Sequence, residues 1–354
     1  MLAPRSFVGL DLGSHGLKAA EVVRSNGGLK ITRLGIVQTP TGAVSKGVAA
    51  DPDALLPAIQ HVLREAGIRT RRVATALGGQ AVIIRELTMP DMPDAELQHA
   101  VMFEAERYLA PGAGDVVADY RLLARVPQEG TIKILLVAAE KTLIDRQLAP
   151  LALAGLSAPV VESTPISMVR ALASCNSVAE PATMYVDVGA ETTDVMILEG
   201  GRLRLSRNIE IGGNDLTRAI ADSLRLEWPA AQSLKEQQAR ILLRGDQAVD
   251  DVAGQVHRAI LPIVTRLATE LRRSLDFYLE RLGGAPVFKV IVVGGTARLG
   301  NLAAFLGEQI EVPVEIGNPL GACEIDAGLA PDFVATAAPV MAAAIGLAMR
   351  GAHT

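Results

Sequence analysis

One short acidic pattern occurs twice in this chain, and the repeat constrains the fold more than any other feature. Residues 7–22 read FVGLDLGSHGLKAAEV, and residues 184–198 read MYVDVGAETTDVMIL. Each copy places an aspartate and a glycine between two apolar runs, namely Asp11 and Gly13 in the first and Asp187 and Gly189 in the second. Apolar runs on both sides of a small-residue turn predict a β-hairpin. Two similar hairpins about half a chain apart predict two similar domains that face each other across a cleft.

A carboxylate inside an apolar strand needs a partner, because burial of an unpaired charge is costly. For Asp11 the candidate partners are a hydrated cation, a metal bound to phosphate and a positively charged side chain. The turn that follows is rich in small residues, so its backbone N–H groups can approach an anion closely. Such a turn alone is ordinary hairpin chemistry, and its recurrence at Asp187 is what favours a binding site. Two facing turns can hold a polyphosphate, and the two carboxylates can hold Mg²⁺ through water.

Composition limits the class of protein. With 354 residues, 49% of them hydrophobic and 21% charged, the chain is long enough for two well-packed domains. A net charge of −5 and an aromatic content of 3% argue against nucleic-acid binding. The five histidines are scattered and the two cysteines lack metal-ligand spacing, so we expect no zinc or iron site. Neither a signal sequence nor an apolar run of membrane-spanning length is present, so we expect a cytoplasmic protein.

The order of the predicted elements divides the chain. Three strands, a helix opened by Asp51 and Pro52, and a fourth strand fill the first 80 residues, which is half of an actin-type ribonuclease H-like unit. We expect an α/β protein with duplicated ribonuclease H-like domains. Its expected parts are a first domain over 1–80 and 156–180, an inserted α+β subdomain over 81–155, and a second domain over 181–354 with a helical subdomain at about 214–285.

Four local signals in these parts can be tested directly. Asp94 is expected to cap the helix of the inserted subdomain, and Trp228 with Pro229 to end the helix that follows Gly213. The pair Gly294 and Gly295 lies between a strand and a helix predicted over 299–310, where its backbone can approach a ribose or an α-phosphate. A last helix is expected over 339–350.

Taken in chain order, these features resemble the signatures of actin-like ATPases. The two hairpins would be the phosphate motifs, the region of Glu162 the connecting motif, and Gly294-Gly295 with AAAIGLAMR the adenosine and closing motifs. The P-loop pattern GxxxxGKS/T is absent. Within this superfamily the chain is most similar to the PilM family of type IV pilus assembly and next to the FtsA cell-division family. The similarity covers nearly the whole length and includes MPDMPDAELQHAVMFEAERYLAP, IEIGGNDLTRAIA and VIVVGGTARLGNL.

The resemblance implies ATP bound between two lobes, with a hydrated Mg²⁺ held by Asp11 and Asp187. The residues expected to border the phosphates and ribose are Gly13, Ser14, Lys18, Gly189, Thr192, Thr193, Gly213, Gly294 and Gly295. Lys235, Arg273 and Arg298 would flank the nucleoside, where an arginine can stack on the adenine. Related proteins often carry a glutamate three residues before this lysine, and this chain has Gln232. Glu162 falls where relatives position the attacking water, so it would be the catalytic residue.

Three functions follow from this resemblance. The first is an ATP-dependent scaffold that binds the cytoplasmic N-terminal peptide of the inner-membrane protein PilN, with a nucleotide state that sets lobe closure. The MPDMP loop and the amphipathic helix over 94–109 would provide an apolar groove for the peptide. Other platform proteins and further copies of the chain are additional candidate partners, and the membrane would be reached only through a partner. We expect at most slow ATP hydrolysis.

The second and third functions are a phosphotransferase and an FtsA-like division protein. A phosphotransferase acting on acetate, sugars or polyphosphate needs a positioned base and a substrate pocket. Here the second turn has Ala190 and Glu191 in place of a triple glycine, and the zinc cysteine cluster of similar sugar kinases is absent. FtsA-like proteins end in an amphipathic membrane helix. The sequence ends at Thr354, directly after the last predicted helix, so membrane binding through that end is not expected.

Overall fold

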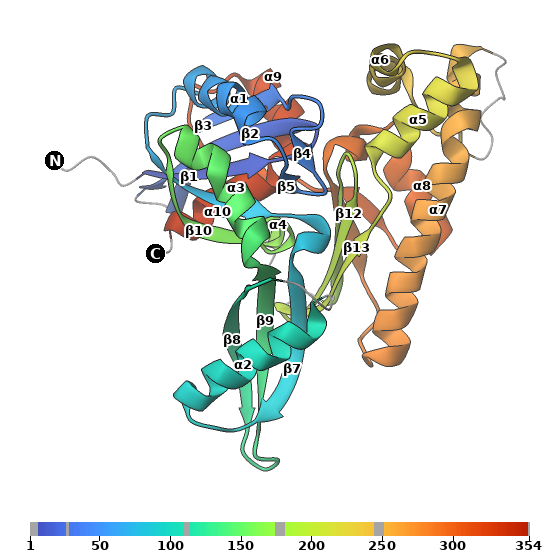
Figure 1. Cartoon of the computed structure of the whole chain (residues 1–354). Helices are drawn as coiled ribbons and strands as arrows, with labels where there is room; N and C mark the ends of the chain where they lie inside the picture. The colour runs from blue at the N-terminus through green and yellow to red at the C-terminus, as the bar shows by residue number, and fades with distance from the viewer. Residues whose placement is uncertain (1–5, 26–27, 110–113, 174–180, 244–250, 353–354) are drawn as a thin grey trace.

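The computed structural model describes residues 6–25, 28–109, 114–173, 181–243 and 251–352. Two lobes, each built on one sheet, stand side by side, and a small subdomain extends below the first (Figure 1). The first sheet has the strand order β10-β6-β1-β2-β3-β16. Its strands are β1 (Ser6–Leu12), β2 (Gly16–Ser25), β3 (Gly28–Gln38), β6 (Arg72–Leu77), β10 (Ser157–Ser163) and β16 (Glu324–Ile325). A separate short hairpin joins β4 (Val44–Ser45) to β5 (Val48–Ala49).

The second sheet repeats the plan of the first. Its order is β13-β12-β11-β14-β15, with β11 (Thr183–Val188), β12 (Thr193–Glu199), β13 (Arg202–Ile209), β14 (Lys289–Val293) and β15 (Val314–Ile316). In both sheets an antiparallel three-strand meander is followed by a strand parallel to the first one, β6 beside β1 and β14 beside β11. The predicted duplication is therefore present in the structure, and each acidic hairpin lies at the centre of its own sheet.

Helices cover both faces of the first sheet. On one face α1 (Pro52–Glu65) and α3 (Lys141–Leu153) cover Leu10 and Leu17, and on the other α4 (Thr164–Ala173) and α10 (Ala342–Ala352) cover the remaining apolar positions. The start of α1 agrees with the sequence, because the Asp51 carboxylate accepts a hydrogen bond from the Ala54 N–H and proline fills the first turn. Successive side chains of β1 and β2 point to opposite faces of the sheet, so the two strands contribute to the core under α1 and α3 and to the core under α4 and α10.

The C-terminal segment returns to the first lobe. Strand β16 pairs with β3, and α10 packs against α4 and β1. The crossing of α10 requires glycine, because a Cβ on Gly346 would lie 1.7 Å from the carbonyl oxygen of Ser167 and one on Gly9 would lie 2.0 Å from that of Ala344. The chain therefore crosses between the lobes twice, between α4 and β11 and again between β15 and the 3₁₀ turn η3 (Pro319–Ala322). This differs from the expected division, which assigned all of 181–354 to the second domain.

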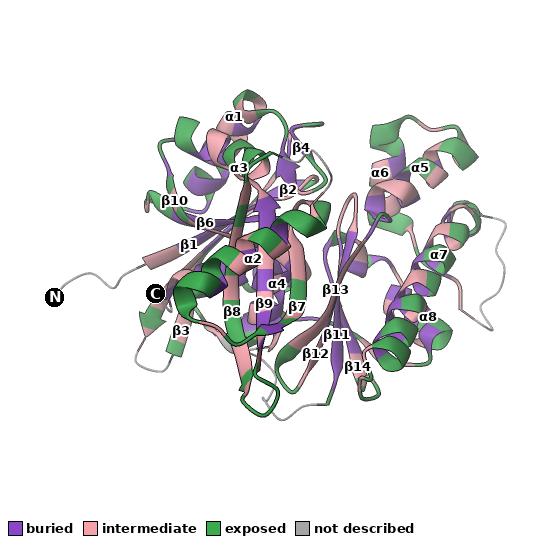
Figure 2. Ribbon diagram, turned by 60° about the horizontal axis from the view of Figure 1, so that its bottom comes forward, coloured by how far each residue is buried: buried purple, intermediate pink, exposed green. Residues whose placement is uncertain are grey.

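The inserted subdomain has its own sheet and core. Its elements are β7 (Ile83–Pro90), α2 (Asp94–Tyr108), β8 (Val116–Val126) and β9 (Thr131–Glu140), with the sheet order β7-β9-β8 and a short 3₁₀ turn η1 (Gly79–Ala81) before them. The central strand β9 carries the buried side chains, and its neighbours are more exposed (Figure 2). Asp94 does not cap α2, because Pro93 occupies the N-cap position and Asp94 is the first helical residue.

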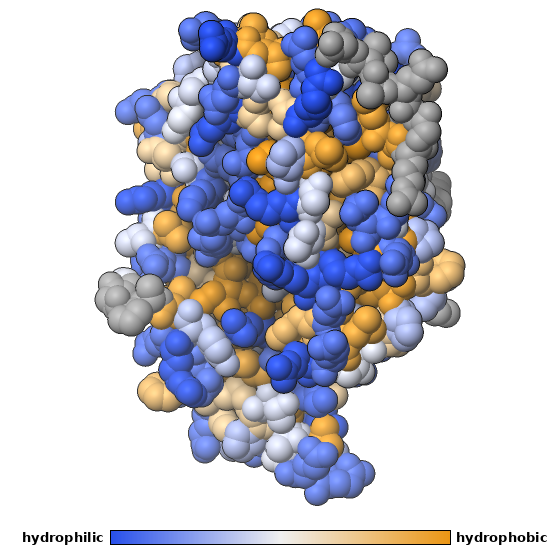
Figure 3. All heavy atoms as spheres, turned by 90° about the vertical axis from the view of Figure 1, so that its right-hand side faces the viewer, coloured by the Kyte–Doolittle hydropathy of each residue, from blue (hydrophilic) through white to orange (hydrophobic). Residues whose placement is uncertain are grey.

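The second lobe is covered by four helices, α5 (Gly213–Leu224), α6 (Trp228–Gln238), α7 (Val252–Arg281) and α8 (Leu302–Ile310). The prediction that Trp228 and Pro229 end a helix is wrong. Helix α5 ends at Leu224, where Arg225 adopts the left-handed conformation, and Pro229 lies in the first turn of α6, which a proline tolerates. The outer face of this lobe is mainly hydrophilic, with smaller hydrophobic areas between (Figure 3).

The segments around the glycine pair and the C-terminus also differ in detail from the sequence expectations. Gly294-Gly295 leads first into the 3₁₀ turn η2 (Gly295–Arg298), and α8 begins only at Leu302. Helix α9 (Pro331–Ala337) and the turn η4 (Ala338–Val340) precede α10. Among the described residues, no single helix has both the length and the apolar composition to cross a bilayer. Residues Pro331–Val340 and α10 meet these criteria only together, and that pair is bent by 91°.

Candidate functional site

The two acidic hairpins open into one cavity of about 710 Å³ between the lobes. Most of the residues predicted for the site line it: Asp11, Gly13, Ser14, Lys18, Asp187, Gly189, Thr192, Gly213, Lys235, Gly294, Gly295 and Arg298. Thr193 does not line the cavity, because its hydroxyl is buried and donates a hydrogen bond to the carbonyl of Ile211 at 2.7 Å. Predicted site residues up to 287 positions apart in sequence, Asp11 and Arg298, thus line one cavity because the lobes face each other.

Asp11 pairs with Lys18 in this structure. The two residues are opposite each other on β1 and β2, and Lys18 Nζ lies 2.9 Å from Asp11 Oδ2. Burial opposes the charged form of Lys18, but the attraction of Asp11 and the hydrogen bond to it prevail and raise the pKa of the lysine. Of the three partners considered for Asp11, the structure therefore shows a positively charged side chain. Glycine is required beside them, since a Cβ on Gly13 would lie 2.7 Å from Lys18 Nζ.

The second hairpin carries two neighbouring carboxylates. Asp187 on β11 is opposite Asp194 on β12. Burial, and then repulsion from Asp194, raises the pKa of Asp187 to about 7. Burial also raises the pKa of Asp194 to about 6, against hydrogen bonds from the Asn208 side chain and the Gly79 backbone. Two carboxylates that oppose each other's ionisation favour the entry of a cation between them and the cleft.

The donor set fits a hydrated magnesium ion. Among the described residues, no group of three or more His, Cys, Asp or Glu is placed to hold a metal. A cation at Asp187 and Asp11 would therefore take its remaining ligands from water and phosphate. Mg²⁺ usually binds in this way, through one or two carboxylates plus substrate phosphates.

The second lobe closes tightly around Asp187. Gly294 has φ +93°, and a Cβ there would lie 2.3 Å from Asp187 Oδ1. The N-terminus of α5, at Gly213, also lies at the cavity, and its first N–H groups already donate hydrogen bonds to the carbonyls of Gly189, Ala190 and Gly212. Lys235 Nζ donates to the Gly213 carbonyl at 2.9 Å, and burial lowers the pKa of Lys235 to about 8. Arg298 reaches the same cavity and donates to the carbonyl of Thr336 at 2.6 Å.

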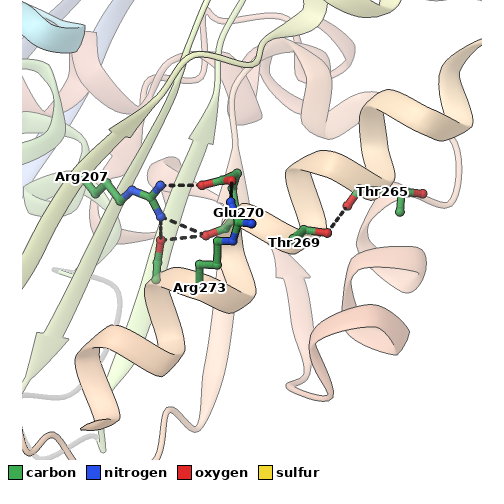
Figure 4. A network of polar contacts seen from close by, with 6 residues as sticks. Arg207, Thr265, Thr269, Glu270 and Arg273 are labelled. Carbon is green, nitrogen blue, oxygen red and sulfur yellow. Dashed lines mark hydrogen bonds and ion pairs between the residues drawn. The ribbon is translucent and has the colours of Figure 1, made fainter. Parts of the chain in front are cut away.

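Two predicted residues lie elsewhere. Glu162, the expected catalytic residue, is outside the cavity lining, and both of its carboxylate oxygens accept hydrogen bonds from Arg170 at 2.6 and 2.5 Å. Arg273 lies on α7 and shares the Glu270 carboxylate with Arg207 (Figure 4). No residue of α7 lines the cavity between the lobes. Neither Glu162 nor Arg273 lines the cavity between the lobes.

Contacts across the cleft were not predicted. Glu191, in the second turn, accepts hydrogen bonds from Ser14 Oγ at 2.8 Å and from the Lys46 N–H at 2.6 Å. Glu210 accepts from Lys46 Nζ at 3.1 Å and from Gln80 Nε2 at 2.7 Å. In the sequence, the signal was that the second turn has the acidic Glu191 in place of a glycine. Its partners Ser14 and Lys46 belong to the first lobe, so they become evident only from the arrangement of the two lobes.

A second cavity, the edge groove, lies between the inserted subdomain and the second lobe. It has a volume of about 750 Å³ and is lined mainly by residues 83–88 of β7 and 203–208 of β13. Strand β7 ends one sheet and β13 ends another, so the groove runs between two sheet edges. Arg273 lines this groove together with Phe277. Asp194 lines both the edge groove and the cleft.

The fold and the two-turn cleft define the class of protein. The structure of EutJ from Carboxydothermus hydrogenoformans matches with a TM-score of 0.59 at 16% identity, over 98% of this chain and 91% of that chain. MreB5 of Spiroplasma citri, bound to ADP, matches with a TM-score of 0.52 at 14% identity, over 89% and 92%. The chain has the actin-like ATPase fold. It belongs to the PilM family, because the family described as type IV pilus assembly protein PilM matches residues 9–352.

Individual relatives agree with this assignment. A chain in the structure of the PilM-PilN type IV pilus biogenesis complex matches with a TM-score of 0.85 at 32% identity, over 98% of both chains. The cell-division protein FtsA of Pseudomonas aeruginosa is 24% identical over 365 residues, which cover 89% of this chain and 83% of that protein. The predicted fold class and the resemblance to the PilM family are thus confirmed.

Proposed function

We propose that the protein is a nucleotide-binding scaffold of type IV pilus assembly, which binds Mg²⁺-ATP in the cleft and the N-terminal peptide of PilN in the edge groove. The observation that carries the proposal is the cavity between the lobes, into which two turns of the same design each present an aspartate. An actin-like relative bound to ADP and the similarity to a chain of the PilM-PilN complex support the two ligands.

Each group in the cleft has a role in this proposal. Asp187 and Asp11 hold the hydrated magnesium ion, which neutralises phosphate charge when bound. Backbone N–H groups of the two turns bind the phosphates, and the positive end of the α5 helix dipole faces them. Lys18, freed in part from Asp11 once a cation is bound, supplies a positive charge to the phosphates. Lys235 and Arg298 flank the nucleoside.

The nucleotide acts mainly by its binding. Glu162 is paired with Arg170 and lies outside the cavity, so it is not placed to position an attacking water. Glu191 ties the lobes together through Ser14 and Lys46, and a nucleotide phosphate in the cleft competes for the same donors. Nucleotide entry therefore replaces one set of bridging contacts by another and sets how the lobes close.

The edge groove is the proposed site for PilN. An extended peptide can add to a sheet edge, where its backbone pairs with the edge strand and its alternate side chains enter pockets. Strand β7 offers such an edge, with Ile84 half-buried on the groove side. The site thus uses the strand of the inserted subdomain, whereas the sequence had suggested the MPDMP loop and the helix after it. PilN would hold the protein at the inner membrane, and other platform proteins or further copies would join through the remaining surface.

Calorimetric titration with Mg²⁺-ATP and with a synthetic PilN N-terminal peptide tests the proposal. We expect Asp187→Ala to weaken nucleotide binding at least about tenfold, which is about 1.4 kcal/mol. The matched control is the exposed Asp222→Ala. We expect Ile84→Glu to abolish peptide binding, whereas Leu122→Glu, on the exposed part of β8, preserves it. A wild-type protein that binds neither ligand contradicts the proposal.

A further inference from the structure

The inserted subdomain has a free sheet edge on the side away from the second lobe. Its sheet order is β7-β9-β8, so β9 pairs with one side of β8, and no strand of the described residues pairs with the other side. Strand β7 borders the edge groove, whereas β8 lies on the opposite side of the subdomain (Figure 1). Residues 116–122, here called the β8 edge, contain neither lysine nor proline, which commonly protect an edge strand, and the bulge of β8 comes only after Leu122.

Hydrogen bonds at two positions show which backbone groups of β8 face outward. The Lys141 N–H donates to the Asp115 carbonyl at 2.7 Å, in the register in which β9 pairs with β8. The backbone groups of successive strand residues point to opposite sides, so the odd-numbered residues from 115 to 121 bond to β9 and the even-numbered ones face the free side. The N–H of Tyr120 agrees with this, because it donates to the Asp119 carboxylate at 2.8 Å. A strand added at this edge therefore meets the N–H and C=O groups of the even-numbered residues.

The β8 edge is complementary to itself when two copies run antiparallel about Tyr120. In this register Tyr120 is opposite Tyr120 of the second copy, and Ala118 is opposite Leu122. Residues with outward backbone groups thus meet each other, as hydrogen-bonded pairs require. The pair between them is Asp119 with Arg121, and the two-fold symmetry produces it twice. Both of these side chains are exposed in the single chain, so they are available to a second copy.

Other antiparallel registers of the same edge lack this match. A register centred on Asp119 or on Arg121 puts two like charges opposite each other, which is destabilising. A register centred on Ala118 puts the Asp119 carboxylate opposite the apolar Val117. Only the register about Tyr120 pairs acid with base and apolar with apolar throughout.

We propose that a second copy of this chain adds to the β8 edge by antiparallel pairing about Tyr120, so that the two inserted subdomains form one continuous sheet. The N–H of Tyr120 then donates to the carbonyl of Tyr120 in the second copy, and Asp119 exchanges this N–H for the guanidinium of Arg121. Opposite charges on directly opposite residues stabilise the pair. No residue of β8 lines the cleft or the edge groove, so self-association goes beyond the proposed function and needs neither of its ligands.

Sedimentation velocity of the full chain measures the association. A short strand pair makes a small interface, and small interfaces are weak or transient, so we expect a dissociation constant on the order of 10 µM. The concentration series runs to about 200 µM, well above that constant. The mean mass should rise along the series from the 37.2 kDa of one chain towards twice that mass.

Two charge reversals test the register. Asp119→Arg alone and Arg121→Asp alone each put like charges opposite each other twice, and we expect each to raise the dissociation constant about tenfold. In an equimolar mixture of the two variants every acid again faces a base, so the mixture should associate like the wild type. The variant that carries both reversals should do so by itself. The matched control is Asp222→Arg, on an exposed residue of the second lobe, which keeps the wild-type constant.

The outcomes separate this edge from other surfaces. A wild type that stays monomeric throughout the series overturns the inference. Association that survives either single reversal also overturns it, because the interface then lies elsewhere. A mixture that stays monomeric while the wild type associates overturns the register, whereas recovery in the mixture shows that both variants are folded. Ligand binding enters none of these measurements, so failure here leaves the proposed function standing.

Discussion

Replacement of Asp187 by asparagine is expected to stabilise the ligand-free protein at high pH and to weaken nucleotide binding. Burial, and then the neighbouring Asp194, raises the pKa of Asp187 from 3.8 to about 7. Between these two pH values the folded chain binds more protons at this position than the unfolded chain does. The free energy of unfolding therefore falls as the pH rises from about 4 to 7. Above pH 7 the full destabilisation of the folded chain by ionised Asp187 is present.

The size of the effect follows from the same two pKa values. A rise from 3.8 to about 7 corresponds to about 4 kcal/mol, at about 1.4 kcal/mol per pH unit. Asp187 faces the cleft and is only partly covered, so water relaxes around the charge, and we take about half of this value, ~2 kcal/mol. Asparagine has the same shape and no charge to desolvate. At pH 8 the variant should be more stable by about 2 kcal/mol, and at pH 5 by roughly two-fifths of that, ~0.8 kcal/mol.

Urea denaturation of both proteins at pH 5, 6.5 and 8 measures this difference, with the exposed Asp222→Asn as the matched control. A gain for Asp187→Asn that is equal at pH 5 and pH 8 refutes the reasoning, because the cost of the raised pKa must shrink as the pH falls towards 3.8, the pKa of the unfolded group. A second measurement links the result to function. Mg²⁺-AMPPNP should raise the melting temperature of the wild type at pH 8. It should raise that of the variant much less, because a ligand that binds more weakly stabilises the folded chain less.

Three further predictions concern packing, lobe closure and the Glu162 ion pair. Gly346→Ala should cost at least about 2 kcal/mol in urea denaturation, because its Cβ would lie 1.7 Å from a carbonyl oxygen of α4, whereas Gly114→Ala should change stability by less than about 0.5 kcal/mol. Glu191→Ala should open the ligand-free lobes, seen as a larger radius of gyration in X-ray scattering; an unchanged radius argues against the bridging role. Arg170→Ala leaves Glu162 only Arg350, whose Nε lies 3.9 Å from Glu162 Oε1; the variant should lose about 2 kcal/mol of stability and keep its nucleotide affinity, so a calorimetric loss of affinity would place Glu162 at the site.

The parts of the fold that the sequence predicted are those with local signals. Alternating apolar residues define the hairpins, and the Asp51-Pro52 cap defines the start of α1. Pairing of β16 with β3 has no such signal, because a two-residue strand has no periodicity and its position is decided by the packing of α10. The pair Trp228-Pro229 was ambiguous for a different reason, since proline suits both the end of one helix and the first turn of the next.

The lining of the cleft was predicted to the extent that the sequence pattern repeats. The aspartates and glycines of the two turns were found because each occurs in both halves. Arg273 was misplaced because the apolar spacing of α7 shows which side of the helix packs on the core but not where the helix lies relative to the cleft, which no residue of α7 lines. Glu191 acts on groups far away in sequence, so its role depends on how the lobes face each other.

The place of the inserted subdomain has a mechanical consequence. The cleft and the edge groove both lie between parts of the first lobe and the second lobe, so a rotation of one lobe relative to the other changes both cavities. The inserted subdomain is carried by the first lobe and β13 by the second. A rotation of the lobes that narrows the cleft therefore also changes the width of the groove between β7 and β13. Closure on a ligand in one cavity is thereby linked to the shape of the other.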